Sequence, residues 1–160
     1  MVIEFILNNK RIVLDVNAEM RLIDLLRSSY KLTGAKLGCL SGVCGACIVL
    51  YNGEAVKSCL IPAFRIGGST VVTIEGFAET DEYCDIVAGL TSTGMEGCLY
   101  CRAGKILTIE SLLAKNSRPT RHEILAGFDG IKCRCTEPDS LVDTVMAIIA
   151  IRQRRLYGRS

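Results

Sequence analysis

The 160-residue sequence has little excess charge and no long apolar segment. Nineteen basic residues stand against seventeen acidic ones, which leaves a formal net charge of +2 at pH 7, and there is no long basic block. Nucleic-acid binding therefore has little electrostatic support. The longest uninterrupted apolar run, 145–151, is far shorter than the roughly 18 residues that suggest a membrane span. We expect a protein that binds no nucleic acid and crosses no membrane.

The beginning of the sequence lacks the features of a secretory signal. Glu4 interrupts its one apolar stretch, and neither a basic leader nor a small-residue cleavage site is present. We therefore expect a cytoplasmic protein. With 49% hydrophobic residues, the chain can bury a sizeable core, as one ordinary domain or as two small ones.

Nine cysteines are the unusual feature of this composition. Disulfides are disfavoured in a reducing compartment, where clustered cysteines more often bind metal or take part in redox chemistry. The spacing of the cysteines decides between these roles.

The first half of the sequence has the pattern of β-strands around one helix. Strands are predicted at 2–7, 11–16, 47–51, 54–60 and 70–74. Hairpin turns are expected at Asn8-Asn9 and at Asn52-Gly53, because asparagine and glycine tolerate the positive φ of tight turns. Apolar residues recur at helical spacing within 20–30, so one short helix should pack on the sheet.

The second half, which we expect to begin near residue 78, has helical patterns. Helices are predicted at 104–113, at 120–126 and from 139 to about 155. Thr120 and Glu123 fit a capping box. Pro138 suits the first turn of the last helix, which is apolar nearly all round. We therefore expect this helix at the centre of a bundle or under a partner subunit.

Four cysteines of the first half form what we call the first cysteine set, with the spacing C-x4-C-x2-C-x11-C. Its members are Cys39, Cys44, Cys47 and Cys59. The first two intervals are those of plant-type [2Fe–2S] proteins. Gly38, Gly42 and Gly45 allow main-chain N–H groups to approach an anionic cluster. A small zinc site or unrelated thiols are the alternative, although a zinc ribbon normally has two C-x2-C pairs.

The second cysteine set lies in the helical half, as a C-x2-C pair and a C-x-C pair. Its members are Cys98, Cys101, Cys133 and Cys135. Each pair precedes a predicted helix, and a helix N-terminus favours thiolate. Four such ligands suit a second cluster, but this spacing taken alone is also compatible with zinc.

The motifs around these cysteines resemble those of the small iron–sulfur subunits of molybdenum hydroxylases, the group of xanthine dehydrogenase, aldehyde oxidoreductase and carbon monoxide dehydrogenase. The likeness rests on G-C-L-S-G-V-C-G-A-C at 38–47, E-G at 75–76, C-L-Y-C-R-A-G at 98–104 and C-R-C-T at 133–136. The resemblance implies an α+β fold. A ferredoxin-like β-grasp domain, 1–77, would precede a four-helix domain, 78–160.

The same resemblance implies an electron relay with no catalytic residue on this chain and no cofactor-binding residue beyond the eight cluster ligands. A molybdopterin centre on a large subunit would pass electrons through the second and then the first [2Fe–2S] cluster to FAD on another subunit of the hetero-oligomer. Two other functions stay open: a free-standing two-cluster carrier, and a module that binds structural zinc.

Several positions depart from the family pattern. At the second C-x2-C the family usually has Q-C-G-F-C-T-P-G, whereas this sequence has Gly97, Leu99 and Arg102-Ala103 at the differing positions. Glu137-Pro138 replaces the usual Gly-Tyr. In the family the glutamine at the position of Gly97 is expected to hydrogen-bond the pterin.

The remaining polar and reactive residues are expected to be structural. Cys84 should be a small buried side chain on a helix. His122 should be a solvated surface residue. The arginines near the end complement the C-terminal end of a helix and should be solvated; they are Arg152, Arg154, Arg155 and Arg159.

Overall fold

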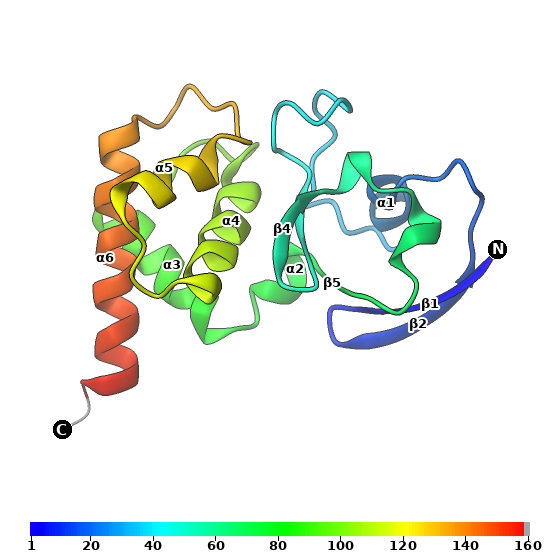
Figure 1. Ribbon diagram of the computed structural model, residues 1–160, viewed down its shortest axis with the longest axis horizontal. Coiled ribbons are helices and arrows are strands. Elements are labelled where there is room, and N and C mark those ends of the chain that lie inside the picture. Colours follow the sequence, from blue (N-terminus) through cyan, green and yellow to red (C-terminus); the bar gives the residue numbers. More distant parts are fainter. Residues whose placement is uncertain (159–160) are drawn as a thin grey trace.

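The computed structural model describes residues 1–158, and Figure 1 shows that their fold has two parts side by side. A five-stranded sheet with its short helices forms one part, and the helices α3 to α6 form the other. The chain is therefore α+β, as its sequence predicts. No helix within residues 1–158 combines the length and the apolar character needed to span a bilayer.

The sheet has the strand order β2-β1-β5-β3-β4 and is mixed, because β1 pairs parallel to β5 while the other pairs are antiparallel. Its strands are β1 (Val2–Leu7), β2 (Lys10–Asp15), β3 (Ile48–Tyr51), β4 (Glu54–Lys57) and β5 (Thr70–Val72). Both predicted hairpin turns are present, with positive φ at Asn8, Asn9, Asn52 and Gly53. Alternate residues of β1 are buried, so one face of this strand contributes to the core.

The predicted helix of the first half is present, but most of it is π-helical. The α-helix α1 covers only Leu22–Asp24, and a π-helical turn follows at Leu25–Ser29. Its buried leucines pack with the apolar face of β1 in one core cluster. The predicted strand 54–60 ends early, since Ser58–Leu60 is a 3₁₀ turn in which both the N–H and the hydroxyl of Ser58 donate to the Cys47 carbonyl. This turn brings Cys59 against Cys47.

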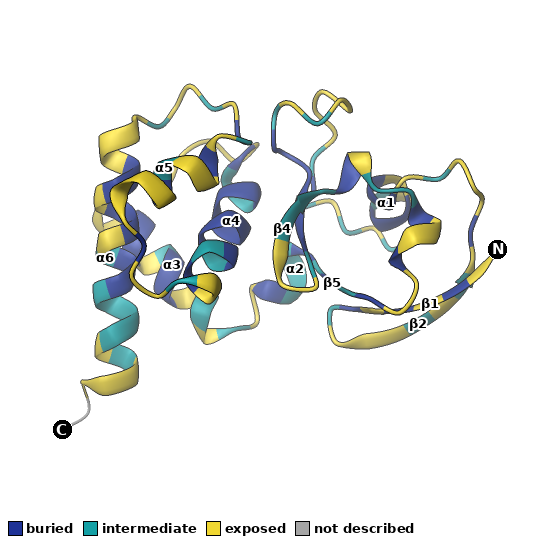
Figure 2. Ribbon diagram, in the orientation of Figure 1, coloured by how far each residue is buried: buried dark blue, intermediate teal, exposed yellow. Residues whose placement is uncertain are grey.

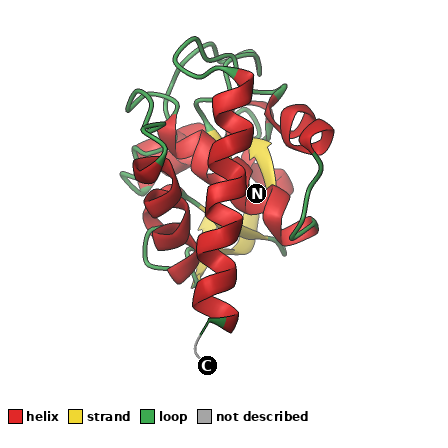
Figure 3. Cartoon of the chain, turned by 90° about the vertical axis from the view of Figure 1, so that its left-hand side faces the viewer, coloured by secondary structure: helices red, strands yellow, loops and turns green. Residues whose placement is uncertain are grey.

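A short helix, α2, follows the sheet, and four longer helices form the helical half. They are α2 (Ile74–Phe77), α3 (Asp81–Ser92), α4 (Arg102–Lys115), α5 (Arg121–Phe128) and α6 (Pro138–Tyr157). The capping box of Thr120 and Glu123 is confirmed at the start of α5, and Pro138 occupies the first turn of α6. Figure 3 shows α6 running along the outside of this half, with the sheet behind it.

Buried charge joins α6 to α3 and α4. Asp85 on α3 is only 5% exposed at its side chain and accepts hydrogen bonds from Arg155 at 2.8–3.1 Å. Arg152 pairs with Glu110 at 2.7 Å and lies 3.5 Å from Asp85. The expectation that these two arginines are solvated was therefore wrong, because α3 and α4 present carboxylates to α6. Arg154 is exposed as predicted, and Arg159 lies outside the described residues.

The two parts of the fold pack tightly together. The apolar core of the helical half includes Ile48 and Leu50 of β3 together with buried residues of α4. Ala55 N–H donates to Ser111 Oγ at 3.0 Å across the same boundary. The sheet and α4 therefore share one interior, which fixes the position of the second half relative to the first.

Two minor expectations have different outcomes. His122 is exposed on α5, as predicted. Cys84 lies on a helix, but its burial was predicted wrongly, because it is exposed. The inward face of α3 is formed by Asp85, Ile86, Gly89 and Leu90 instead.

Candidate metal centres

Both cysteine sets lie on loops at the same end of the molecule, the upper edge in Figure 1. The first set comes from the loop before β3 and from the 3₁₀ turn after β4. The second comes from the segment that leads into α4 and from the loop between α5 and α6. Figure 2 shows that these loops are largely exposed at their outer rims, while the chain beneath them is buried.

Main-chain amides converge on the outer sulfur of the first set. The N–H groups of Ser41, Val43 and Cys44 lie 3.2–3.4 Å from Cys39 Sγ, and that of Ala46 lies 3.5 Å from Cys44 Sγ. Hydrogen bonds from the Ser41 side chain and from these backbone amides lower the pKa of the Cys39 thiol to about 5. The loop is therefore shaped to stabilise negative charge on sulfur.

The inner pair of the first set lies in the apolar interior. Cys47 and Cys59 are buried and pack with Ile23. Burial raises the pKa of Cys47 to about 11, so its thiolate form needs a positive partner such as a metal. The first set thus combines an exposed and a half-buried thiol, Cys39 and Cys44, with two buried ones.

The glycines of this loop have two different roles. Gly42 and Gly45 both have a φ of +76°, the left-handed region that favours glycine. Gly38 does not have positive φ; instead, a Cβ placed there would lie 2.6 Å from Cys44 Sγ. The loop therefore needs Gly38 for the space beside a sulfur rather than for its backbone freedom.

Three of the four sulfurs of the second set lie in contact. Cys101 Sγ is 3.6 Å from Cys98 Sγ and 3.4 Å from Cys133 Sγ. Two thiolates that share one tetrahedral metal lie about 3.8 Å apart, given metal–sulfur bonds of about 2.3 Å. The observed separations are close to that value and much longer than a disulfide bond. Each of these two pairs therefore has the spacing of thiolates that share a metal ion.

Buried and exposed thiols also differ within the second set. Burial, with the neighbouring Cys133 and Cys98, raises the pKa of Cys101 to about 12. Backbone N–H groups of Cys101 and Tyr100 lower the pKa of the exposed Cys98. Burial opposes ionisation of Cys133, but the Cys135 amide, 3.3 Å from its sulfur, and the Lys105 ammonium outweigh it and lower its pKa to about 7.

Electrostatic repulsion acts on the remaining member of this set. The negative charges of Cys98 and Cys133 raise the pKa of Cys135.

Within residues 1–158, no group of three or more His, Cys, Asp or Glu side chains is arranged to hold a single metal ion. The contacts that do occur are pairwise, as described above.

Direct hydrogen bonds join the two sets of loops. Lys132 N–H, next to Cys133, donates to the Cys44 carbonyl at 3.2 Å. Tyr100 Oη, between Cys98 and Cys101, donates to the Leu37 carbonyl at 2.6 Å. These contacts place the two sets side by side although they are far apart in the sequence.

Close packing of glycine backbone supports the same junction. A Cβ on Gly104, in the first turn of α4, would lie 2.5 Å from the carbonyl oxygen of Gly45. A Cβ on Gly45 would lie 2.8 Å from the Gly130 carbonyl oxygen. The first loop therefore touches both segments that carry the second set.

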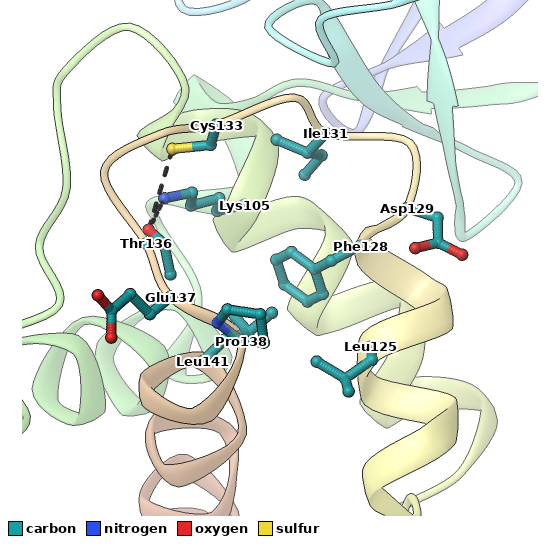
Figure 4. Close-up of a pocket in the computed structure, with 10 residues that line it drawn as sticks. All are labelled: Lys105, Leu125, Phe128, Asp129, Ile131, Cys133, Thr136, Glu137, Pro138 and Leu141. Atoms are coloured by element: carbon teal, nitrogen blue, oxygen red, sulfur yellow. Dashed lines mark hydrogen bonds between the residues drawn. The ribbon is translucent and has the colours of Figure 1, made fainter.

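A cavity of about 330 Å³ lies beside the second set, between α5 and the start of α6. Figure 4 shows its mainly apolar wall, with Lys105 pointing toward Cys133 and Thr136. Lys105 was not singled out from the sequence. Its position four residues after Cys101, and so on the same face of a helix, was the available signal.

Comparisons with protein families agree with this geometry. Residues 5–66 match the family model described as "2Fe-2S iron-sulfur cluster binding domain", and residues 73–146 match "[2Fe-2S] binding domain". Each match contains one complete cysteine set. The fold and the two sets thus define an iron–sulfur protein with two [2Fe–2S]-binding domains.

Individual relatives show which iron–sulfur proteins these are. The "Nicotinate dehydrogenase small FeS subunit" of Eubacterium barkeri is 43% identical over 72% of this chain and 74% of that protein. The "Nicotine 6-hydroxylase small subunit" of Paenarthrobacter nicotinovorans is 37% identical over 87% of this chain and 84% of that protein. The chain belongs to the family of iron–sulfur small subunits of molybdenum hydroxylases, the xanthine dehydrogenase family.

A solved structure extends the likeness to the three-dimensional fold. A chain of quinoline 2-oxidoreductase from Pseudomonas putida 86 superposes with a TM-score of 0.85 at 32% identity. The match covers 98% of this chain and 97% of that chain. The present chain is accordingly the electron-transfer iron–sulfur subunit of an oxidoreductase, as its motifs predict.

Proposed function

We propose that this chain holds one [2Fe–2S] cluster at each cysteine set and relays electrons from a molybdopterin centre on a large subunit to FAD on a further subunit. Cys39, Cys44, Cys47 and Cys59 would ligate the first cluster. Cys98, Cys101, Cys133 and Cys135 would ligate the second.

The observation that carries this proposal is the direct junction between the two sets. Lys132 bonds to the Cys44 carbonyl, and Tyr100 bonds to the Leu37 carbonyl. Electron tunnelling slows steeply with distance, so a relay needs its two centres held close in a fixed arrangement. Two unrelated structural metal sites would have no such requirement.

The residues of the chain perform three tasks in this relay. When bound, each cluster accepts and releases a single electron. The thiolates fix its position, and amides such as that of Val43 stabilise its negative charge. Buried Cys47 and Cys101 keep one side of each site away from water. No residue of this chain takes part in substrate chemistry.

Exposed apolar side chains beside both sets support the expected partners. Leu99, between Cys98 and Cys101, is 79% exposed. Leu40, Val43 and Leu60 are exposed around the first set. Exposed apolar side chains around a redox site are typical of a protein–protein interface. We assign the rim at Leu99 to the large subunit and the other rim to the FAD subunit.

The finer description of the fold is part of the same proposal. We take residues 1–77 as a β-grasp ferredoxin-like domain and residues 78–160 as a four-helix domain. The mixed sheet with α1 on one face supports the first assignment, and the packing of α3 to α6 supports the second. A cytoplasmic location is supported by nine cysteines that are all free of disulfides.

The pterin contact must differ in detail from the usual one. Gly97 has no side chain, and its φ of +66° disfavours any other residue. Loss of one solvent-replaceable hydrogen bond costs about 0.5–1.5 kcal/mol, too little to abolish docking. We therefore propose that the pterin still lies beside Cys98 and Cys101, bound by backbone groups, a water or the large subunit.

Anaerobic purification of the native complex tests the partnership. Molybdenum and flavin should co-purify with the chain, together with iron and a visible iron–sulfur absorption. If iron is present without a molybdenum subunit, the chain is a free-standing carrier. Stoichiometric zinc in a colourless protein would contradict the electron-transfer role altogether, because zinc has a filled d shell.

A further inference from the structure

Lys105 is a buried lysine with no carboxylate partner. It lies in the first turns of α4 and is only 3% exposed. Its ammonium donates a hydrogen bond to Thr136 Oγ1. Among the ion pairs of residues 1–158, none includes Lys105. Burial of an unpaired cation is strongly unfavourable, so a negative group must lie nearby.

The sulfurs of the second cysteine set lie beside the ammonium, whereas Glu137 and Asp129 line the same cavity without forming an ion pair with Lys105. Thr136 Oγ1, which accepts the lysine hydrogen bond, lies 3.9 Å from Cys133 Sγ. The Lys105 amide bonds to the Cys101 carbonyl one helical turn earlier. Figure 4 shows the Lys105 nitrogen in the space between Cys133 and Thr136.

The ammonium also lies beside the segment that leads into the other cysteine pair of this set. A Cβ on Gly97, which precedes Cys98, would lie 3.4 Å from Lys105 Nζ. The charge thus sits against both segments that carry the set, in an interior where salt screens it little. The first set differs, because the donors to its sulfurs are main-chain amides and the Ser41 side chain, which carry no net charge.

We propose that the positive charge of Lys105 raises the reduction potential of the second cluster and leaves that of the first nearly unchanged. This inference rests on the ligand sets proposed above. Reduction adds one electron, and therefore one negative charge, to the cluster, and no bond forms or breaks. A fixed positive charge favours the more negative reduced form. The second cluster, on the molybdenum side of the relay, is therefore a stronger electron acceptor than it would be without this lysine.

The test is a dithionite titration of the anaerobic native complex, followed by electron paramagnetic resonance (EPR). In Lys105→Met the oxidised-to-reduced ratio of the second cluster at a fixed potential should rise about tenfold or more, a shift of about 59 mV or more to lower potential. Lys105→Gln should do the same, which covers the case in which the Met variant fails to fold. Lys105→Arg should retain most of the wild-type value.

Lys132→Met is the matched control, because it removes an equal charge from an exposed residue next to Cys133. Solvent screens that charge, so its ratio should change less than about threefold. The inference is overturned if Lys105→Met and Lys105→Gln shift the second cluster no more than Lys132→Met does, or if they shift both clusters equally. Absence of iron from the wild-type second set would instead overturn the proposed ligation.

Discussion

The two cysteine sets meet the same electrostatic demand by different means. In the first set, four main-chain amides point at Cys39 and Cys44. In the second, main-chain amides act on Cys98 and Cys133 as well, but the buried ammonium of Lys105 is added to them. Amide dipoles depend on the whole course of a loop, whereas a single substitution removes a side-chain charge. The second site is therefore the one whose potential can change without rebuilding its loop.

Removal of a ligand should have the largest effect, and it tests whether the two sets are independent. Cys59→Ala should abolish the first cluster alone, and Cys133→Ala the second alone, because the two proposed ligand sets lie in separate parts of the fold. Cys84→Ala, at an exposed cysteine outside both sets, is the control and should spare both. Visible and EPR spectra of the three variants measure this. Loss of both signals from one ligand substitution would mean that the sets are mixed.

The next effect concerns the junction between the sites. Gly45→Ala should destabilise the protein by about 2–4 kcal/mol, because φ is +76° and the new Cβ would meet the Gly130 carbonyl. Gly53→Ala is the matched control: φ is +83°, but no atom lies within 4 Å of its Cβ. It should cost only about 1 kcal/mol. Thermal unfolding of the cluster-loaded protein compares the two, and equal losses would argue against a tight junction.

A smaller effect should show whether the helical half, which carries the second set, can lose stability separately from the first half. Asp85→Asn should cost about 1.5–3 kcal/mol, because the buried carboxylate loses charge-assisted hydrogen bonds from Arg155. During denaturation the second cluster signal should then disappear before the first. Asp81→Asn, at an exposed carboxylate, should change stability by less than about 0.5 kcal/mol. Simultaneous loss of both signals would show that the two halves unfold as one unit.

The smallest expected effect is that of Tyr100→Phe. The ring stays, but the 2.6 Å hydrogen bond to the Leu37 carbonyl is lost, at a cost of about 0.5–1.5 kcal/mol. Magnetic coupling between the two reduced clusters, seen by EPR, should weaken or broaden while both clusters stay loaded. Unchanged coupling would mean that the backbone contacts between the loops hold the two sites at their distance without the Tyr100 hydrogen bond.

The sequence predicts those parts of the fold that depend on local chemistry. Asn8-Asn9 and Asn52-Gly53 form the expected turns, since few other residues tolerate their φ, and Thr120 with Glu123 forms the expected cap. The π-helical turn after Asp24 could not be predicted in this way, because its apolar spacing resembles that of an α-helix. The local pattern therefore predicted that a helix is present here but not that most of it is π-helical.

Contacts between distant segments account for the other differences. Cys84 was predicted to be buried, but Asp85 takes the inward position because Arg155, far along the chain, neutralises it. Lys105 is a charged residue within an apolar pattern, and its burial follows from the thiols that the fold brings around it. The eight proposed ligands could be named from the sequence, because the first set has plant-type spacing and the motifs around the second resemble those of the family. The groups that stabilise them belong to the folded structure.

The most direct test of the account is iron and sulfide analysis of the anaerobically prepared protein, combined with EPR during stepwise reduction. The account predicts about four iron atoms per chain and two distinct one-electron signals, one assigned to each cysteine set by the Cys59→Ala and Cys133→Ala variants. A single signal, about two iron atoms, or stoichiometric zinc without visible absorption would contradict it.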